Sequence, residues 1–272
     1  MNSLYIGVGV AIILALVTAL VGPLFVDWGT HRAVFEAEAS RIVGLPVRVL
    51  GDVDARLLPS PRVRFGDVVV GDLARPVARV GRFDLDLDVA GLIRGETRVS
   101  DLVLDRPAVD LTIETDGRIV GLPEHGADLT DVHIEAIRFV DGRARLTDLR
   151  SDTDWTATRL EGSGSVESLG GSWRLDVAGQ SQGRALSLRL AARGSGEARQ
   201  LRTVLSLSDL GVTVSGDLTA GDPATRPGLA GPITVEKRDD AALPITATAA
   251  MALDPDGMRL DDLAVVIGDA VE

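Results

Sequence analysis

Residues 83–89 read FDLDLDV, and this alternation of apolar and acidic side chains decides the fold. Successive side chains of a β-strand point to opposite faces of the sheet, so such a strand has one dry face and one wet face. The same period of two recurs in VDLTIE, residues 109–114, and in LSLRL, residues 186–190. From Leu45 onward the chain is therefore predicted to be mainly β, built from half-buried strands.

Turn-forming residues separate these stretches at roughly ten-residue spacing, which predicts about a dozen strands. No helical period follows Gly44, so βαβ crossovers are not expected and the sheet is predicted to be elongated, antiparallel and meander-like. The acid-rich run from Glu124 to Asp131 divides it into a first β segment, 45–123, and a second, 124–272. The turn signals are Gly51-Asp52, Pro59-Ser60-Pro61, Gly66-Asp67, Gly71-Asp72, Asp116-Gly117, Asp141-Gly142, Gly170-Gly171, Gly194-Ser195-Gly196, Gly221-Asp222-Pro223 and Asp256-Gly257.

The N-terminus predicts a membrane anchor over residues 1–26. Leu4 to Val26 is a run of 23 uncharged residues, and a helix of that length spans about 34 Å, enough to cross a bilayer. Tyr5 lies near one end of the run and Trp28 just past the other, where amphipathic rings favour the membrane interface. A cleaved signal peptide is the alternative, but the run exceeds an ordinary signal-peptide core and no Lys or Arg precedes it.

A short amphipathic helix is predicted next to the membrane, over residues 27–44. Gly44 and Pro46 supply its stop signal. Its apolar face is expected to cap the end of the sheet, because its charged residues do not form the basic face of membrane-surface helices. The side chains at helical spacing are Trp28, Arg32, Phe35, Ala39 and Ile42.

Composition excludes several classes of protein. A net charge of −12 argues against a nucleic-acid partner, whose phosphates need a basic face. The absence of cysteine excludes disulfides and cysteine-ligated zinc. Aromatic residues are only 3% of the chain, so its core must be built from small aliphatic side chains on many short elements. That favours repetitive β structure over a compact enzyme, and no cofactor is expected.

Residues 179–183, GQSQG, match the G-x-S-x-G pattern of a serine-hydrolase nucleophile elbow. That motif needs a strand before it and a helix after it. The following residues alternate as a strand, so a hairpin turn is predicted in place of a catalytic Ser181.

Asp84, Asp86 and Asp88 alternate as the ligands of a calcium loop do. A calcium loop also needs a glycine at its sixth position and a glutamate at its twelfth. Val89 and Gly95 stand there, so a solvated strand face is predicted.

The three histidines, His31, His125 and His133, have no helical i, i+4 spacing that would pair two of them as metal ligands. Surface or interface positions are expected for them, and no metal site is predicted.

An aliphatic stripe along the predicted strands is the candidate functional surface. A sheet with one continuous apolar face must bury that face against something. In a sandwich the partner is a second sheet, and in a half-open groove it is lipid; alternation alone does not separate the two. The candidate groove residues are Val47, Val49, Val63, Phe65, Phe83, Leu85, Leu87, Val109, Leu111 and Ile113.

Four stretches together resemble the AsmA family of bacterial envelope proteins, a group related to the longer TamB-like proteins. FEAEASRIVGLPVRVLGDVDARLLPSPRVRFGDVVVGD, residues 35–72, resembles the family's helix, Gly-containing turn and strands around a Pro-rich step. GLIRGETRVSDLVLDRPAVDLTIETDGRIVGL, residues 91–122, is similar to its strand pair that ends in an Asp-Gly turn. Weaker similarity follows in IRFVDGRARLTD, residues 137–148, and SWRLDVAGQSQGRALSLRLAARG, residues 172–194.

The resemblance implies a single-pass protein of the inner membrane whose bulk lies in the periplasm. It implies a curved β-groove that holds or conducts phospholipid acyl chains, a role in outer-membrane assembly, and envelope proteins as possible partners. An adaptor that assists outer-membrane protein assembly without binding lipid is the alternative. Family members are usually longer than this chain, so the second β segment is expected to be incomplete at its C-terminus.

Overall fold

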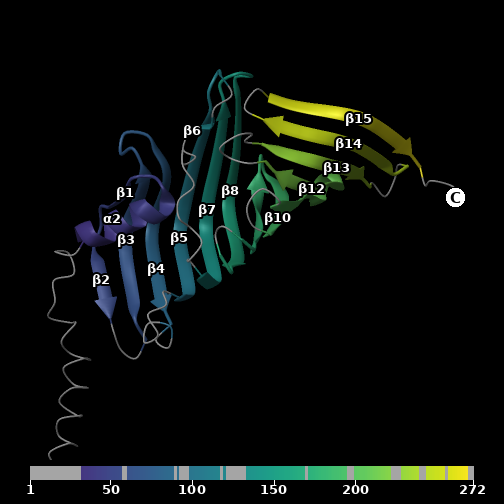
Figure 1. Ribbon diagram of the computed structural model, residues 1–272. Coiled ribbons are helices and arrows are strands. Elements are labelled where there is room, and N and C mark those ends of the chain that lie inside the picture. Colours follow the sequence, from purple (N-terminus) through teal and green to yellow (C-terminus); the bar gives the residue numbers. More distant parts are fainter. Residues whose placement is uncertain are drawn as a thin grey trace, which may run out of the picture.

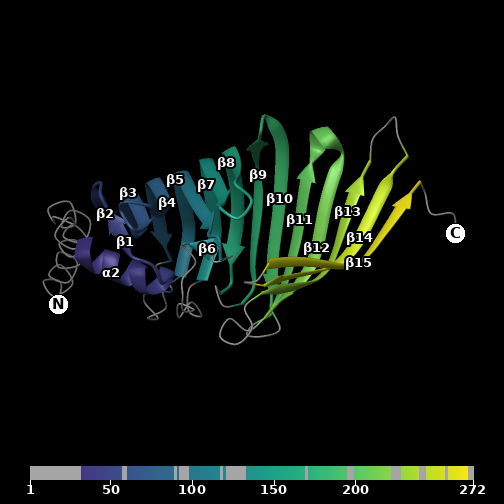
Figure 2. The same ribbon diagram turned by 90° about the horizontal axis from the view of Figure 1, so that it is seen from above.

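The computed structural model describes residues 32–56, 60–88, 91, 98–116, 119–120, 133–168, 171–194, 199–221, 228–238, 243–254 and 257–268. Within these residues an α-helix is followed by fifteen strands that belong to one hydrogen-bonded sheet. The sheet is a single layer that curves along its length (Figures 1 and 2). The mainly-β prediction is confirmed, and the sandwich alternative is wrong for the described strands, because they form no second layer.

The elements in chain order are α2 (Arg32–Val43), β1 (Val47–Val49), β2 (Val53–Arg56), β3 (Arg62–Gly71), β4 (Pro76–Leu87), β5 (Arg98–Ile113), β6 (Ile119–Val120), β7 (His133–Asp148), β8 (Thr153–Val166), β9 (Trp173–Ser181), β10 (Arg184–Arg193), β11 (Gln200–Leu207), a short 3-10 turn η4 (Ser208–Leu210), β12 (Val212–Ala220), β13 (Leu229–Lys237), β14 (Ile245–Asp254) and β15 (Gly257–Ile267).

Most strands pair with their neighbours in sequence, antiparallel, as a meander does. The pair β5–β7 is parallel, so the prediction of a wholly antiparallel sheet is wrong at this position. A parallel pair needs a connection long enough to return the chain to the same end of the sheet, and residues 114–132 provide that length. The predicted boundary at 124–131 falls in this connection and lies outside the described residues. The division into two β segments stays a prediction, and the strands on either side pair directly.

A line of β-bulges crosses the sheet from β3 to β8. Asp67, Arg106, Asp141 and Arg159 each have a positive φ between 48° and 53°, the left-handed conformation typical of one bulge class. The strand pairing is interrupted at each of these positions. The register is the same on both sides of the interruption from β3 to β7, and it shifts at the interruption between β7 and β8 and between β8 and β9. On the intervening strand β4 the neighbouring residue is Gly81, where an added Cβ would lie 3.2 Å from the guanidinium of Arg106.

Each bulge shifts the alternation of its strand by one residue. On β5 the apolar side chains are even-numbered before the bulge, at Leu102 and Leu104, and odd-numbered after it, at Val109 and Leu111. The shift keeps both halves of the strand apolar on the same side of the sheet. The predicted turns at Gly66-Asp67 and Asp141-Gly142 are therefore wrong: both lie inside long strands, because a bulge uses the same left-handed backbone as a turn.

Helix α2 lies within the predicted helix 27–44 and across the N-terminal end of the sheet (Figures 1 and 2). It ends at Val43, and the N–H of Gly44, whose φ is 74°, donates to the carbonyl of Ser40 and closes the last turn. Phe35 and Ala39 pack against the sheet's first apolar cluster, so the predicted capping role is confirmed. The predicted anchor, residues 1–26, and residues 27–31 lie outside the described residues. Among the residues that are described, no helix is long and apolar enough to cross a membrane.

Two glycines allow a direct test of how tightly the strands pack. An added Cβ at Gly162 would lie 2.5 Å from Cε1 of Phe139 and 2.5 Å from the carbonyl oxygen of Asp176. For one at Gly216 the nearest atom would be Cγ2 of Ile233, at 3.3 Å. Gly162→Ala is expected to lower the free energy of unfolding by about 1–3 kcal/mol through overpacking. Gly216→Ala, the matched control, is expected to change it by less than about 1 kcal/mol. Urea unfolding followed by circular dichroism measures both, and equal effects would contradict the packing described.

Candidate functional site

One face of the sheet carries unbroken rows of uncharged side chains, and we call it the apolar face. Residues that pair across neighbouring strands point to the same side of a sheet, so the register traces each row. One row crosses every strand on the path from β3 to β15 without a charged residue. It runs through Phe65, Phe83, Leu104, Phe139, Gly162, Val177, Leu188, Leu205, Val214, Val235, Ala247 and Val265.

The structure brings all ten predicted groove residues to this face. Val63 and Leu85 form a second row with Leu102 of β5 and Ile137 of β7, and Leu87 pairs with Val99. The three residues of β5 beyond the bulge, Val109, Leu111 and Ile113, lie on the same face. Val47 and Val49 pair with Val70 and Val68 of β3 at the N-terminal edge.

Burial divides these residues into two groups. Val47, Val49 and Phe65 are at most 9% exposed, and they belong to the cluster that Phe35 and Ala39 of α2 cover. The other seven predicted residues are only half-buried. A face packed under a second layer would be dry throughout, so most of the apolar face is open.

Aromatic rings pack together at the end of the apolar face that α2 covers. The rings of Phe35 and Phe65 meet edge to face with centroids 5.4 Å apart, and those of Phe65 and Phe83 follow at 5.9 Å. Edge-to-face packing at these distances is the favoured geometry of aromatic pairs. Helix α2 therefore extends the apolar row of the sheet by one aromatic ring.

Sequence reasoning missed several residues of the face, among them Leu102, Leu104 and Phe139. Leu102 belongs to a buried cluster with Val99, Ile134 and Val166, formed by β5, β7 and β8. The alternation of Leu102 and Leu104 is visible in the sequence, but it is out of phase with Val109 to Ile113. Only a bulge at Arg106 reconciles the two patterns on one face.

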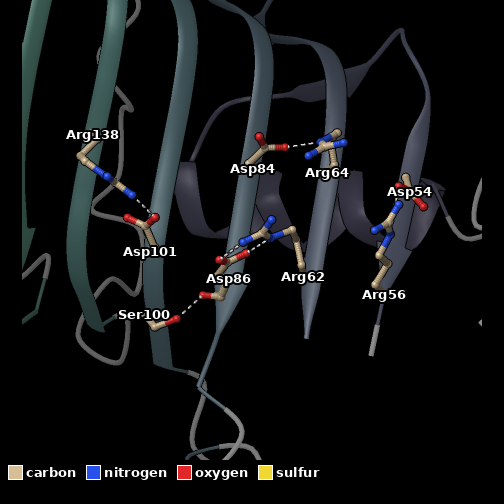
Figure 3. Close-up of polar contacts among 9 residues, drawn as sticks. All are labelled: Asp54, Arg56, Arg62, Arg64, Asp84, Asp86, Ser100, Asp101 and Arg138. Atoms are coloured by element: carbon tan, nitrogen blue, oxygen red, sulfur yellow. Dashed lines mark hydrogen bonds and ion pairs between the residues drawn. The ribbon is translucent and has the colours of Figure 1, made fainter. Parts of the chain in front are cut away.

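The opposite face is polar and carries Arg–Asp pairs between adjacent strands (Figure 3). Nε of Arg64 donates to Asp84 at 2.6 Å, and Arg62 contacts Asp86. Asp86 stands directly opposite Asp101, whose carboxylate accepts a hydrogen bond from Arg138. The prediction of a solvated strand face for the acidic residues of β4 is confirmed, with arginines as their partners.

Three described carboxyl groups elsewhere on the sheet, those of Asp67, Asp148 and Asp154, have lowered pKa values. The hydrogen bond from Arg79 lowers the pKa of Asp67, and the hydrogen bonds from the Arg150 side chain and backbone lower the pKa of Asp148 to about 2. A group whose pKa is lower in the folded state stabilises the fold above its unfolded pKa, about 3.9, and loses that contribution as the pH falls. The pairs are therefore intact at neutral pH.

The G-x-S-x-G segment forms a hairpin, as predicted. β9 ends at Ser181 and β10 begins at Arg184, and Gln182 and Gly183 between them have φ values of 51° and 78°. Positive φ at both central residues is the hallmark of a two-residue hairpin turn. Ser181 is 8% exposed, and its hydroxyl donates to the carbonyl of Thr156 at 3.0 Å.

Of the histidines, His31 and His125 lie outside the described residues. A ring nitrogen of His133, at the start of β7, is 3.2 Å from the carbonyl oxygen of Glu167. Within the described part of the chain, no three His, Asp or Glu side chains gather in a way that could hold a metal ion.

Because the carboxylates of Asp86 and Asp101 face each other, removing their arginine partners is expected to lower the stability of the fold. Arg62→Gln combined with Arg138→Gln leaves like charges directly opposite, which is expected to destabilise the fold by about 0.5–1 kcal/mol. Arg202→Gln is the control, because Arg202 lies 3.8 Å from Asp217 and both side chains are about 70% exposed; its effect is expected to be near zero. Thermal unfolding at low salt compares them, and an unchanged midpoint for the double variant would refute the role given to these pairs.

Comparison with known proteins agrees with the N-terminal architecture. The family model described as AsmA family matches residues 4–120, which run from the predicted anchor through α2 and the strands β1 to β6. No curated protein and no solved structure matches the chain. The match confirms the inferred resemblance for the N-terminal part of the chain: residues 4–120 match the AsmA family model, and the weaker similarity of residues 137–148 and 172–194 stays a prediction.

Proposed function

We propose that this protein is anchored in the inner membrane and supports outer-membrane biogenesis by holding or conducting phospholipid acyl chains along its apolar face. The observation that carries the proposal is the uncharged row that crosses the sheet from β3 to β15 on a face that remains largely open. An open aliphatic face in water is unfavourable, so it needs an apolar partner. Acyl chains are such a partner.

The dimensions and energetics of the face suit this role. Strands lie about 4.8 Å apart, so the path from β1 to β15 is about 58 Å long, more than twice the length of one acyl chain. Each methylene that leaves water for this surface gains about 0.8 kcal/mol. Because that attraction is non-directional, a chain can move from one strand to the next without losing a specific contact. The proposed role needs no bond to be made, so it is non-catalytic and uses no cofactor.

The polar face supports the same assignment. Arg–Asp pairs such as Arg64–Asp84 keep that side of the sheet hydrated, so the two faces offer a lipid opposite environments. The acyl chains would lie on the apolar face while the polar head group stays in water. The proposed location is the periplasm, with residues 1–26 as a single-pass anchor in the inner membrane.

An adaptor role without lipid is the second candidate, and the edge of β15 favours it. Among the described residues β15 pairs with β14 alone, and Leu263 and Ile267 are 68% and 67% exposed. An open strand edge can recruit another protein by strand addition. A well-folded protein without bound lipid would favour this candidate.

Acidic side chains on the apolar face are expected to remove bound lipid. Leu85→Asp with Leu87→Asp places two carboxylates in the proposed acyl-chain path, where burial of an unpaired charge is strongly unfavourable. Phospholipid that co-purifies with the full chain from membranes should fall to background, as measured by lipid extraction and mass spectrometry. Unchanged lipid content would reject the groove assignment for β4.

Two further variants separate lost binding from lost folding. Val103→Asp adds a carboxylate to the polar face, beside Asp84 and Arg138 in the register, and is expected to retain lipid. Val235→Asp alters the apolar face on β13, away from both buried clusters, and is expected to lose lipid while the circular dichroism of the sheet is kept.

The proposed anchor has its own test. The full chain is expected to stay in the membrane fraction after an alkaline wash, because a helix of about 20 apolar residues inserts stably. The same chain without residues 1–26 should be released. Release of the full chain, or a mature N-terminus beyond residue 20, would show a cleaved signal peptide in place of an anchor.

A further inference from the structure

Helix α2 covers the end of the apolar face on which lipid is proposed to lie. Phe35 and Ala39 pack against the cluster of Val47, Val49 and Phe65, and the ring of Phe35 stacks edge to face on Phe65. This contact continues the apolar row of the sheet. The helix therefore fills the position that an acyl chain would occupy on the first strands.

Polar contacts tie α2 to the edge of the sheet. The backbone N–H of Val49 donates to Oε1 of Glu36, and that of Val47 donates to Oγ of Ser40, both at 2.8 Å. The guanidinium of Arg32 donates to the carbonyl oxygen of Gly51 at 2.8 Å. The side chain of Glu36 is only 13% exposed. The hydrogen bonds to Glu36 and Ser40 satisfy two backbone donors of β1 that bond to no strand, because β1 pairs with β3 alone among the described strands.

The helix is otherwise loosely held. None of its residues is buried, and Val34 is 66% exposed. An open hollow of about 550 Å³ lies beside these hydrogen bonds, lined by residues of α2 and of the start of β1 that include Ala37, Leu45 and Pro46. Elements with few buried apolar contacts open at low free energy. Only residues 27–31 separate α2 from the predicted membrane anchor.

We propose that α2 is a lid on the apolar face, and that its departure exposes the first strands to an incoming acyl chain. In the closed state Phe35 takes the place of the lipid above Phe65. In the open state the hydrogen bonds of Glu36 and Ser40 are broken, and a phospholipid leaving the adjacent membrane reaches β3 and β4. This inference rests on the proposed function, and it adds where lipid enters and what controls its entry.

A reversible cross-link tests the lid. The chain has no cysteine, so Phe35→Cys with Phe65→Cys creates the only thiols, and a short bis-methanethiosulfonate reagent joins them until a reductant removes it. The full chain in nanodiscs is mixed with phosphatidylethanolamine and phosphatidylglycerol vesicles that carry a pyrene-labelled phospholipid. Cross-linking is expected to slow lipid uptake at least about tenfold, and reduction is expected to restore it, because only the open population binds.

A released lid gives the opposite result. Glu36→Ala with Ser40→Ala removes both hydrogen bonds to β1, which is expected to raise the open population and the uptake rate about fivefold or more. Ser40→Ala alone is expected to give a smaller increase, and it replaces the double variant if that variant loses the circular dichroism of the sheet.

The outcomes separate the two proposals. Equal uptake by the cross-linked and reduced forms would overturn the lid while leaving the lipid-binding face intact. An unchanged rate in the hydrogen-bond variants would also overturn it. If the unmodified chain takes up no lipid, the proposed function fails and the lid fails with it. Slower uptake when locked and faster uptake when released would establish the lid.

Discussion

The structure depends on one constraint: every strand must keep its aliphatic side chains on the same side of a single-layer sheet. Side chains alternate with a period of two, so a strand that is one residue out of phase would turn its apolar residues to water. The strands β5, β7 and β8 have 14 to 16 residues each, and each contains such a phase change. The bulges at Arg106, Asp141 and Arg159 absorb it. Because these bulges lie on neighbouring strands, they form one line across the sheet, and the aliphatic side chains stay on the same face on both sides of that line.

This constraint explains which parts of the fold could be predicted from sequence. Residues 83–87 on β4 and LSLRL on β10 lie on stretches with unbroken alternation, and this alternation identified the correct face. The bulges could not be told from turns, because Gly66-Asp67 and Asp141-Gly142 suit the left-handed backbone that both structures use. The parallel pair β5–β7 was also hidden, because a strand buried on one face shows the same alternation in either direction.

The candidate site could also be predicted in part, because the alternation of apolar side chains along several strands is visible in the sequence. The predicted residues of β1, β3, β4 and β5 all reach the apolar face. Its continuation over β8 was missed because Gly162 and Gly164 occupy the inward positions there, and glycine gives no apolar signal. The ring of Phe139 lies against Gly162 and covers that gap, an arrangement that depends on a neighbouring strand and cannot be read from local periodicity.

Together the two faces explain how a sheet of this kind can meet lipid and water at once. Pairs such as Arg64–Asp84 keep one face polar. On the other face, α2 is the only described element that covers the uncharged rows. The central claim is that the partner of the rest of this face is a phospholipid. Native mass spectrometry of the full chain, released from detergent micelles after purification from membranes, tests it most directly. The account predicts mass additions that correspond to bound phospholipid at a defined stoichiometry, and a well-folded, lipid-free protein would contradict it.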